Sequence, residues 1–371
     1  MAIDITGLPV EQIDFAISPL AELGMALHVL AGANHHPGLD GWTTATTAGL
    51  EAELAGRLGE ADFLWRRAYA DVFQPFAGIN KGPARPGATL AQELDLLDRL
   101  DDERFASAAL EFAALPHLPQ GEEASPLADA TLRRRSLELA AAHGPRQLAF
   151  THRLLTEPGQ VRIWLRRLFE DCGEAFFDVT WERVRAPLAA DARHKQDLLH
   201  RHGAAEALRA ASKALSVDED GTRIRIDKLV EDRTTAVDPD VGAGLTLMPT
   251  TFGWPHLMVL TAPGWRPVVH YPLSTPQLTP PAPVRLVQER LQALAHPVRM
   301  VLCRHLARTA HSTAELASLL GLTAPETSRH LSTLKKAELL TTRRRGRYVL
   351  HQLDTAAVAR LGGEYLEGIL R

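Results

Sequence analysis

Residues 323–331 carry the sequence Thr-Ala-Pro-Glu-Thr-Ser-Arg-His-Leu. Thr323 and Glu326 have the spacing of a capping box, and Pro325 falls in the first turn, where its missing amide costs little. A helix is therefore predicted to begin at Thr323. Leu331 and Leu334 mark its buried face, and the other side is left to polar residues, namely Ser328, Arg329, Ser332 and Lys336.

The segments on either side predict a compact order of elements. A short helix should open at residues 312–317 and stop at Gly321, a natural residue for a helix C-terminus. Two helices are predicted before it, over 284–295 and from 297 to about 307. After it come two alternating segments, 339–343 and 347–353, which predict a basic β-hairpin joined through Arg344, Arg345 and Gly346. With a last helix from about 354 to 370, these elements predict a winged helix-turn-helix.

This fold suggests which residues would contact DNA. The helix from Thr323 fits the major groove, with its first turns presented to base edges. The hairpin arginines fit phosphate or minor-groove contacts, which give affinity more than sequence readout. The predicted contact residues are Thr323, Pro325, Glu326, Ser328, Arg329, Ser332 and Lys336 on the helix and Arg343, Arg344, Arg345 and Arg347 on the hairpin.

Several spaced segments of this C-terminal part resemble the signature of the ArsR/SmtB superfamily of bacterial repressors, and together they cover about a quarter of the chain. They are Leu-Ala-His-Pro-Val-Arg at 294–299, Glu-Leu-Ala at 315–317, Thr-Ser-Arg-His-Leu at 327–331 and Arg-Arg-Gly-Arg-Tyr at 344–348. The resemblance implies a homodimer, formed through the first and last helices of the domain, that binds an inverted-repeat operator. It also places His330 on the recognition helix. One departure is Glu338, where relatives commonly have glycine.

Many members of that superfamily sense metals, but the ligands known in the family are missing from this C-terminal part. Where relatives have cysteine thiolates, residues 311–315 contain none, and the last helix offers only Asp354, Glu364 and Glu367 without a histidine. Soft metals prefer thiolates, and zinc prefers cysteine or histidine. Cys303 is interpreted as a core residue. The sequence therefore predicts no metal site and no cofactor.

Length and charge point to two domains. At 371 residues the chain exceeds one ordinary core, and four prolines within 274–283 predict a stiff linker between domains 1–273 and 284–371. Residues 284–371 hold fourteen basic and seven acidic side chains, a balance of +7, whereas the first 283 residues carry 27 and 38, a balance of −11. Only the C-terminal part is therefore expected to meet a polyanion. With two distant cysteines, no secretory signal and no long apolar run, we expect a cytoplasmic protein.

The N-terminal domain is predicted to be α-rich with a small sheet, so the fold class is mostly α (α+β). Helices are expected over 46–74, 89–115, 126–142, 146–156, 160–171 and 177–212, and short strands at 13–17, 222–226, 245–248, 257–260 and 268–271.

No catalytic motif occurs in this domain: it lacks a phosphate-binding glycine loop, a nucleophile elbow and a zinc-protease helix, so no enzyme is predicted. The histidines at 194, 200 and 202 are interpreted as a solvated helix face, and His35-His36 as a turn that could also bind a ligand. Aromatic residues along the helices are more often core than pocket. Those that could line an apolar pocket are Trp164, Phe177, Trp181 and Trp254.

The chain also resembles a group of long ArsR-like regulators with an uncharacterised N-terminal domain, through Ser-Pro-Leu-Ala-Glu-Leu at 18–23 and Phe-Gly-Trp-Pro at 252–255. The predicted function is a transcriptional regulator, a repressor by resemblance, whose N-terminal domain senses a small organic ligand. The alternative is a ligand-free dimerisation or protein-interaction module. A closed apolar cavity near Trp254 or Trp181 would favour the sensor, and a flat hydrophobic two-fold surface would favour the module.

Overall fold

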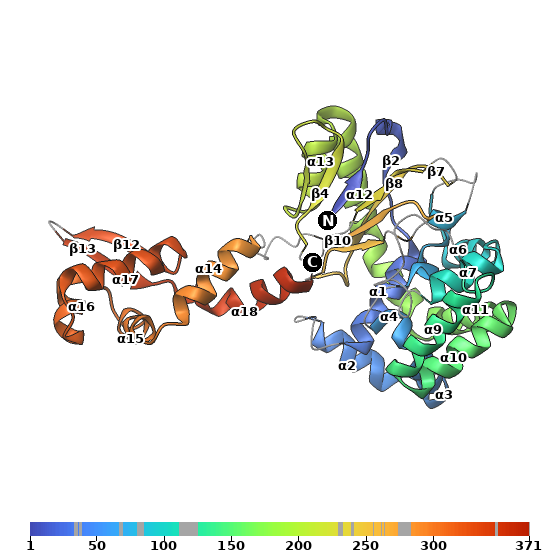
Figure 1. The fold of residues 1–371 in the computed structure, drawn as a ribbon, viewed down its shortest axis with the longest axis horizontal. Coiled ribbons are helices and arrows are strands. Elements are labelled where there is room, and N and C mark those ends of the chain that lie inside the picture. The colour runs from blue at the N-terminus through green and yellow to red at the C-terminus, as the bar shows by residue number, and fades with distance from the viewer. Residues whose placement is uncertain are drawn as a thin grey trace. The chain divides into compact units, whose positions relative to one another are not determined.

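A computed structural model of the chain describes residues 1–32, 36, 39–66, 70–79, 85–110, 125–228, 233–238, 241–254, 256–260, 262, 264–273, 283–345 and 348–370. The chain divides into two compact units, residues 1–278 and 279–370, called here the body and the tail (Figure 1). The predicted linker at 274–283 lies almost wholly outside the described residues, so its stiffness and the domain boundaries stay predictions. The described helices include none that is both long enough and apolar enough to cross a membrane.

Helices make up most of the body, as predicted. They are α1 (Pro19–Ala31), α2 (Asp40–Gly49), α3 (Ala52–Ala61), α4 (Phe63–Arg66), α5 (Pro75–Gly78), α6 (Leu90–Asp98), α7 (Asp102–Ala109), α9 (Ala130–His143), α10 (Pro145–Thr156), α11 (Pro158–Cys172), α12 (Asp178–His202) and α13 (Ala204–Ala211). Short 3₁₀ turns lie at Val10–Gln12 (η1) and Asp71–Phe73 (η3), and a π-helical turn at Gly173–Phe177 (η5) joins α11 to α12.

Helix α1 is the central helix of the body, because every residue from Pro19 to Val29 is buried. Its N-terminus is held by a carboxyl group from α6: Glu93 Oε2 accepts hydrogen bonds from the Ser18 hydroxyl and the Leu20 amide, each at 2.7 Å. Burial raises the pKa of Glu93 to about 8. A buried carboxyl group therefore anchors the start of the helix.

Three of the predicted long helices are wrong in extent. The predicted 46–74 segment is broken where Leu50 and Glu51 take extended backbone angles, giving α2 and α3. The predicted 89–115 helix ends at Asp98, and Asp101 caps a new helix by accepting a hydrogen bond from the Arg104 amide at 2.8 Å. The predicted 177–212 helix stops at Gly203, whose φ of 83° an L-residue rarely adopts.

Within the described part of the body, the strands form two four-stranded sheets and one two-stranded ribbon. The strands are β1 (Ala2–Asp4), β2 (Ile13–Phe15), β3 (Leu215–Val217), β4 (Arg223–Ile226), β5 (Arg233–Thr235), β6 (Val237–Asp238), β7 (Gly242–Ala243), β8 (Leu245–Thr250), β9 (Met258–Leu260) and β10 (Val268–Pro272). Their orders are β3-β4-β1-β5, β2-β8-β10-β9 and β6-β7. The predicted pairing of the 13–17 segment with the later strands is confirmed, since β2 pairs parallel with β8.

The β2-β8-β10-β9 sheet lies between two cores. On β10, Val268 joins the helical core around α1, whereas Val269 and Tyr271 join a second core with α12 and α13. Because both faces of this sheet are covered, all six residues of β8 are buried. Its sequence accordingly contains no charged residue, and its two polar residues, Thr246 and Thr250, are buried as well.

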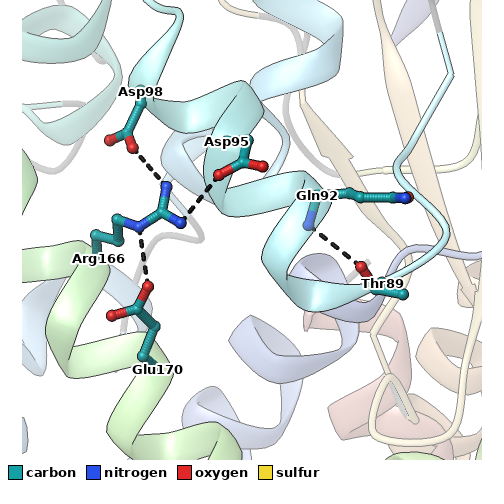
Figure 2. Close-up of polar contacts among 6 residues, drawn as sticks. All are labelled: Thr89, Gln92, Asp95, Asp98, Arg166 and Glu170. Atoms are coloured by element: carbon teal, nitrogen blue, oxygen red, sulfur yellow. Dashed lines mark hydrogen bonds and ion pairs between the residues drawn. The ribbon is translucent and has the colours of Figure 1, made fainter.

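An arginine joins α11 to α6 at the edge of the helical core (Figure 2). Arg166 forms ion pairs with Asp95 at 2.9 Å, Asp98 at 2.5 Å and Glu170 at 2.9 Å. Its side chain is 24% exposed. At the start of α6, Thr89 accepts a hydrogen bond from the Gln92 amide at 3.3 Å, which confirms the predicted N-terminus of that helix.

The tail has the predicted order of elements. It comprises α14 (Val284–Leu294), α15 (Pro297–Leu306), β11 (His311–Ser312), α16 (Thr313–Leu320), α17 (Ala324–Lys336), β12 (Leu340–Arg345), β13 (Tyr348–Leu353) and α18 (Thr355–Leu370), with sheet order β11-β13-β12. Cys303 lies in the tail core with Leu302 and Leu306, as interpreted from the sequence. The winged helix-turn-helix is confirmed.

Candidate nucleic-acid interface

The two helices of the helix-turn-helix are fixed by local hydrogen bonds. Ser312 and Glu315 form a reciprocal capping box at the start of α16, and Gly321 ends that helix with φ 63°. Thr323 then accepts a hydrogen bond from the Glu326 amide at 3.3 Å at the start of α17. The turn between the helices therefore has little conformational freedom, and α17 is presented from a rigid frame.

Helix α17 buries one face and exposes the other. Thr327, Leu331 and Leu334 are buried. Most residues predicted to contact DNA lie on the exposed side, and these are Thr323, Pro325, Ser328, Arg329, Ser332 and Lys336. Two of the predicted contacts, Thr323 and Glu326, also bond to each other through their side chains, since the Thr323 hydroxyl donates to Glu326 Oε2 at 3.4 Å.

His330 is half-buried, and its ring centroid lies 5.0 Å from that of His296. Burial and the nearby charges of His296 and Arg299 lower the pKa of His330 below its ordinary value. At neutral pH the imidazole is therefore neutral. It can offer a hydrogen bond to a base or phosphate but no positive charge.

The β12-β13 hairpin is longer than predicted. Arg344 pairs with Val349, and Arg345 pairs with Tyr348, so both arginines are strand residues and not part of the turn. The arginines that the structure describes with side chains, Arg343 and Arg344, are exposed and point to opposite faces because strand residues alternate. Arg347 and Gly346 lie outside the described residues, as does the side chain of Arg345.

Glu338, which stands where relatives commonly have glycine, has a φ of 54° in the left-handed region. It lies directly after α17, where the chain turns into β12. Arg290 from α14 reaches this turn: its Nε donates to the Ala337 carbonyl oxygen at 3.2 Å, and its guanidinium pairs with Glu364 of α18 and lies 3.9 Å from Glu338. The Arg290 side chain is 6% exposed, so it links three elements from inside the tail.

Sequence reasoning missed two basic features of the tail. Lys335 is exposed beside Lys336 in the last turn of α17, where both lysines also favour the helix C-terminus. Buried Arg290 was not singled out. An arginine on the apolar side of an amphipathic helix was the signal that could have identified it.

The aromatic residues predicted to line a ligand pocket lie in and around the helical core. Phe177 is fully buried, and Trp164 and Trp181 pack against the same core. Phe177 stacks on Trp181 with ring centroids 6.0 Å apart. Trp254 is half-buried, and its carbonyl oxygen accepts a hydrogen bond from His36. Their role in ligand binding stays a prediction.

The body has a surface hollow of about 740 Å³, and none of those four aromatics lines it. Its lining comes from residues 11–19, the 85–88 segment and α12, and includes Phe15, Ile17, Arg85, Gln196 and His200. Arg85 forms two hydrogen bonds to Asp14, at 3.0 and 3.1 Å, and Gln196 accepts from the Phe15 amide at 2.7 Å. The hollow thus combines apolar walls with oriented polar groups.

The histidines of the body differ in exposure. His194, His200 and His202 are exposed on α12, as expected for a solvated face. Lys195 on the same helix is buried, pairs with Asp191 and lies 4.7 Å from the centre of the Tyr271 ring, which the sequence pattern missed. His36 is almost fully buried, with 1% of its surface exposed, whereas its neighbour His35 lies outside the described residues.

Comparison with known families divides the chain at a similar place. A family described as "Family of unknown function (DUF5937)" matches residues 1–277, and a family described as "Helix-turn-helix domain" matches residues 294–343.

Two curated relatives are similar to the tail. The "HTH-type transcriptional regulator KmtR" of Mycobacterium tuberculosis is 36% identical over 91 residues, which is 24% of this chain and 70% of that protein. The "Biofilm growth-associated repressor" of Agrobacterium fabrum is 35% identical over 71 residues, which is 19% of this chain and 61% of that protein. The second alignment thus spans less than two thirds of its relative.

Solved structures similar to this chain match a comparable share of it. NolR from Sinorhizobium fredii is 25% identical and covers 23% of this chain and 91% of its own, with a TM-score of 0.20. The homodimeric winged helix-turn-helix domain of Mb0332 from Mycobacterium bovis, described as that of a possible ArsR-family regulator, is 27% identical and covers 21% and 72%, with a TM-score of 0.20.

Proposed function

Because this chain belongs to the DUF5937 family and ends in the DNA-binding winged helix-turn-helix of ArsR-type transcriptional regulators, we propose that it is a ligand-responsive repressor. In this proposal a homodimer binds an inverted-repeat operator through its two tails, and the body senses a small organic molecule. We place its action in the cytoplasm, where a regulator of this type meets the chromosome.

The observation that carries the proposal is the exposed side of α17. Arg329 and Ser328 are exposed near its N-terminus, and α17 packs against β12, which carries exposed Arg343 and Arg344. In a DNA-binding protein of this fold, the helix is expected to contact bases in the major groove and the basic hairpin to contact the DNA phosphates.

Exposed apolar residues of the tail support a dimer. Leu291 on α14 and Tyr365 and Ile369 on α18 are 40–43% exposed, and these two helices pack against each other. Side chains of this kind on neighbouring helices fit a surface that a second copy would cover. Two symmetric tails would then read two half-sites of an inverted repeat.

The hollow in the body is where we place the ligand of the sensor, although it opens at the surface and lies away from Trp181 and Trp254, where a closed cavity was expected. Its volume falls within the range of roughly 300–1,000 Å³ seen for small-molecule sites, and it has a mixed apolar and polar lining. The described part of the body exposes few large apolar side chains, only Val10, Ile163 and Val179. Three single side chains, on η1, α11 and α12, are too few to form a large apolar interface.

The experiment that tests this function is selection of genomic DNA fragments by the purified full chain. A repressor of this kind should enrich fragments that share an inverted repeat, and the genes beside them would suggest the class of effector. Enrichment without any common sequence would contradict operator recognition.

A second experiment tests the sensor. A compound that releases the protein from a recovered operator should no longer do so when Ile17→Trp fills the hollow. The control is Ile163→Trp, at an exposed site on α11 that does not line the hollow, and this variant should respond to the compound normally.

A further inference from the structure

Three histidines from distant parts of the sequence meet inside the body. His28 lies in the last turn of α1, His36 follows that helix, and His256 lies between β8 and β9. Their ring centroids are 5.1, 5.1 and 4.8 Å apart, and the three residues are 6%, 1% and 6% exposed. This cluster is well separated along the sequence from the exposed histidines of α12.

Two of the rings are oriented by backbone carbonyl oxygens. The Nδ1 atom of His28 lies 2.5 Å from the Trp65 carbonyl oxygen, and Nδ1 of His36 lies 2.8 Å from that of Trp254. A ring nitrogen bonded to a carbonyl oxygen must carry the proton, so in a neutral ring Nε2 has the lone pair. Histidines that bind metals show this arrangement, with one nitrogen donating to a carbonyl group and the other facing the ion.

The candidate donor atoms of the three rings converge. One nitrogen from each histidine can be chosen so that all lie within 4.8 Å of one another. A tetrahedral zinc ion with Zn–N bonds of about 2.0–2.1 Å would hold its ligand nitrogens roughly 3.4 Å apart. Small side-chain rotations that draw the rings inward by about 1 Å would complete such a site.

The three imidazole groups favour a divalent ion of borderline softness. Buried imidazoles that stay neutral are good ligands for zinc and neighbouring transition metals, and poor ones for calcium or magnesium, which require oxygen.

We propose that His28, His36 and His256 bind one zinc-class ion, with a water molecule or another small ligand at a fourth position. The ion would tie the end of α1 to the loop between β8 and β9, segments that are more than 200 residues apart in sequence. All three ligands belong to the body, and the inference does not rest on the proposed regulatory function.

The first test is equilibrium zinc binding to the full chain, purified with a chelator and then freed of it, without DNA. In competition with a chromophoric chelator, we expect one equivalent per chain with a dissociation constant below about 1 μM. Zinc should also raise the melting temperature of the body, because an ion that binds only the folded state stabilises it. Wild-type protein that binds no zinc at 10-fold higher concentrations would overturn the proposal, whatever the variants do.

Variants then assign the site. His256→Gln and His28→Gln should each weaken zinc binding more than about 100-fold, whereas His194→Gln, at an exposed position on α12, should bind like the wild type. Binding that persists unchanged in both core variants would assign the zinc to other histidines and overturn the proposal.

One variant distinguishes the loss of a metal ligand from the loss of the fold. His256→Cys should keep cobalt binding, because a thiolate is also a good ligand, and should add a thiolate-to-cobalt charge-transfer band that the wild type lacks. Circular dichroism would establish that this variant is folded. A folded variant without the band would show that residue 256 does not bind the ion.

Discussion

The body and the tail differ in how many large apolar side chains they expose. Among the described residues, the body exposes the large apolar side chains Val10, Ile163 and Val179, whereas the tail, about a third as long, exposes seven: Leu291, Met300, Val301, Leu319, Val349, Tyr365 and Ile369. The body therefore covers its own core. The tail exposes apolar and basic side chains together, as expected of a unit that functions by binding other molecules.

The two units also differ in how they use arginine. In the body, Arg166 gathers three carboxylates at a partly exposed site, and in the tail Arg290 links Glu364 and the Ala337 carbonyl oxygen from a buried one. Water screens the first arrangement and not the second. The comparison predicts unequal consequences when each arginine is removed.

The largest effect is expected for Arg290→Ala. It would remove the buried ion pair to Glu364 and the hydrogen bond to the Ala337 carbonyl oxygen, and should destabilise the tail by about 3–5 kcal/mol. Arg166→Ala should cost the body about 1 kcal/mol, because its pairs are partly solvated. Calorimetry of the full chain would separate the two unfolding transitions, and Arg285→Ala, whose side chain is 89% exposed, is the matched control in α14. Equal losses in the two units would refute the comparison.

The next effect concerns the dimer. Leu291→Asp combined with Ile369→Asp should raise the dimer dissociation constant at least about 100-fold, since each apolar contact occurs twice in a symmetric interface. Sedimentation equilibrium measures this. Val179→Asp changes a valine on the body that is 62% exposed, more than Leu291 or Ile369, and should leave the dimer intact. If only the body variant dissociates the protein, the dimer forms through the body.

DNA affinity should respond to the recognition helix. Arg329→Ala should weaken operator binding by about 1–3 kcal/mol, because a base or phosphate contact would be lost. Binding titrations on a selected operator measure the loss. Arg308→Ala, exposed after α15, is the control and should bind normally. Unchanged affinity and specificity of the Arg329 variant would remove that residue from the interface.

The wing should control salt dependence more than sequence preference. Replacing Arg343 and Arg344 by Gln should lower the slope of log affinity against log salt by about 1 for each arginine that contacts a phosphate. Arg193→Gln on the body should leave the slope unaltered. A double wing variant with the wild-type slope would mean that the wing does not touch the backbone of DNA.

The smallest effect is expected at Glu338. Glycine accepts a φ of 54° without strain, so Glu338→Gly should stabilise the tail by about 1 kcal/mol despite the loss of the long contact to Arg290. Thermal unfolding measures the gain. Glu338→Ala removes the carboxylate but keeps the strain and should not stabilise. A gain of equal size for alanine would trace the effect to charge.

How far the sequence predicted the structure also differs between the units. The tail's helix ends carry local signals, such as the Ser312 and Thr323 caps and Gly321, so its helices were predicted nearly to the residue, whereas strand β11 was not predicted. In the body, Gly49 directly precedes the helix break at Leu50 and Glu51, but this glycine lies within a segment whose apolar spacing predicts one continuous helix. There the periodicity continues across the break, and packing around α1 decides where helices end.

The sites also differ in whether local sequence signals could predict them. The exposed side of α17 is a property of one helix and can be inferred from spacing alone. The histidine cluster needs α1 and the loop before β9 to come together, and His28 and His256 were not singled out. His36 drew attention only as part of a His-His pair. No local pattern indicates contacts between residues so far apart in sequence.

The sheets of the body have a consequence for the order of events during synthesis. Strand β1 lies between β4 and β5, and β2 pairs with β8, so the first strands made bond to strands made last. The body cannot complete these sheets until after residue 272 has been added, roughly 14–54 s after residue 1 at 5–20 residues per second. The tail needs only its own 92 residues and emerges afterwards. The nascent chain therefore completes its body before the DNA-reading unit exists.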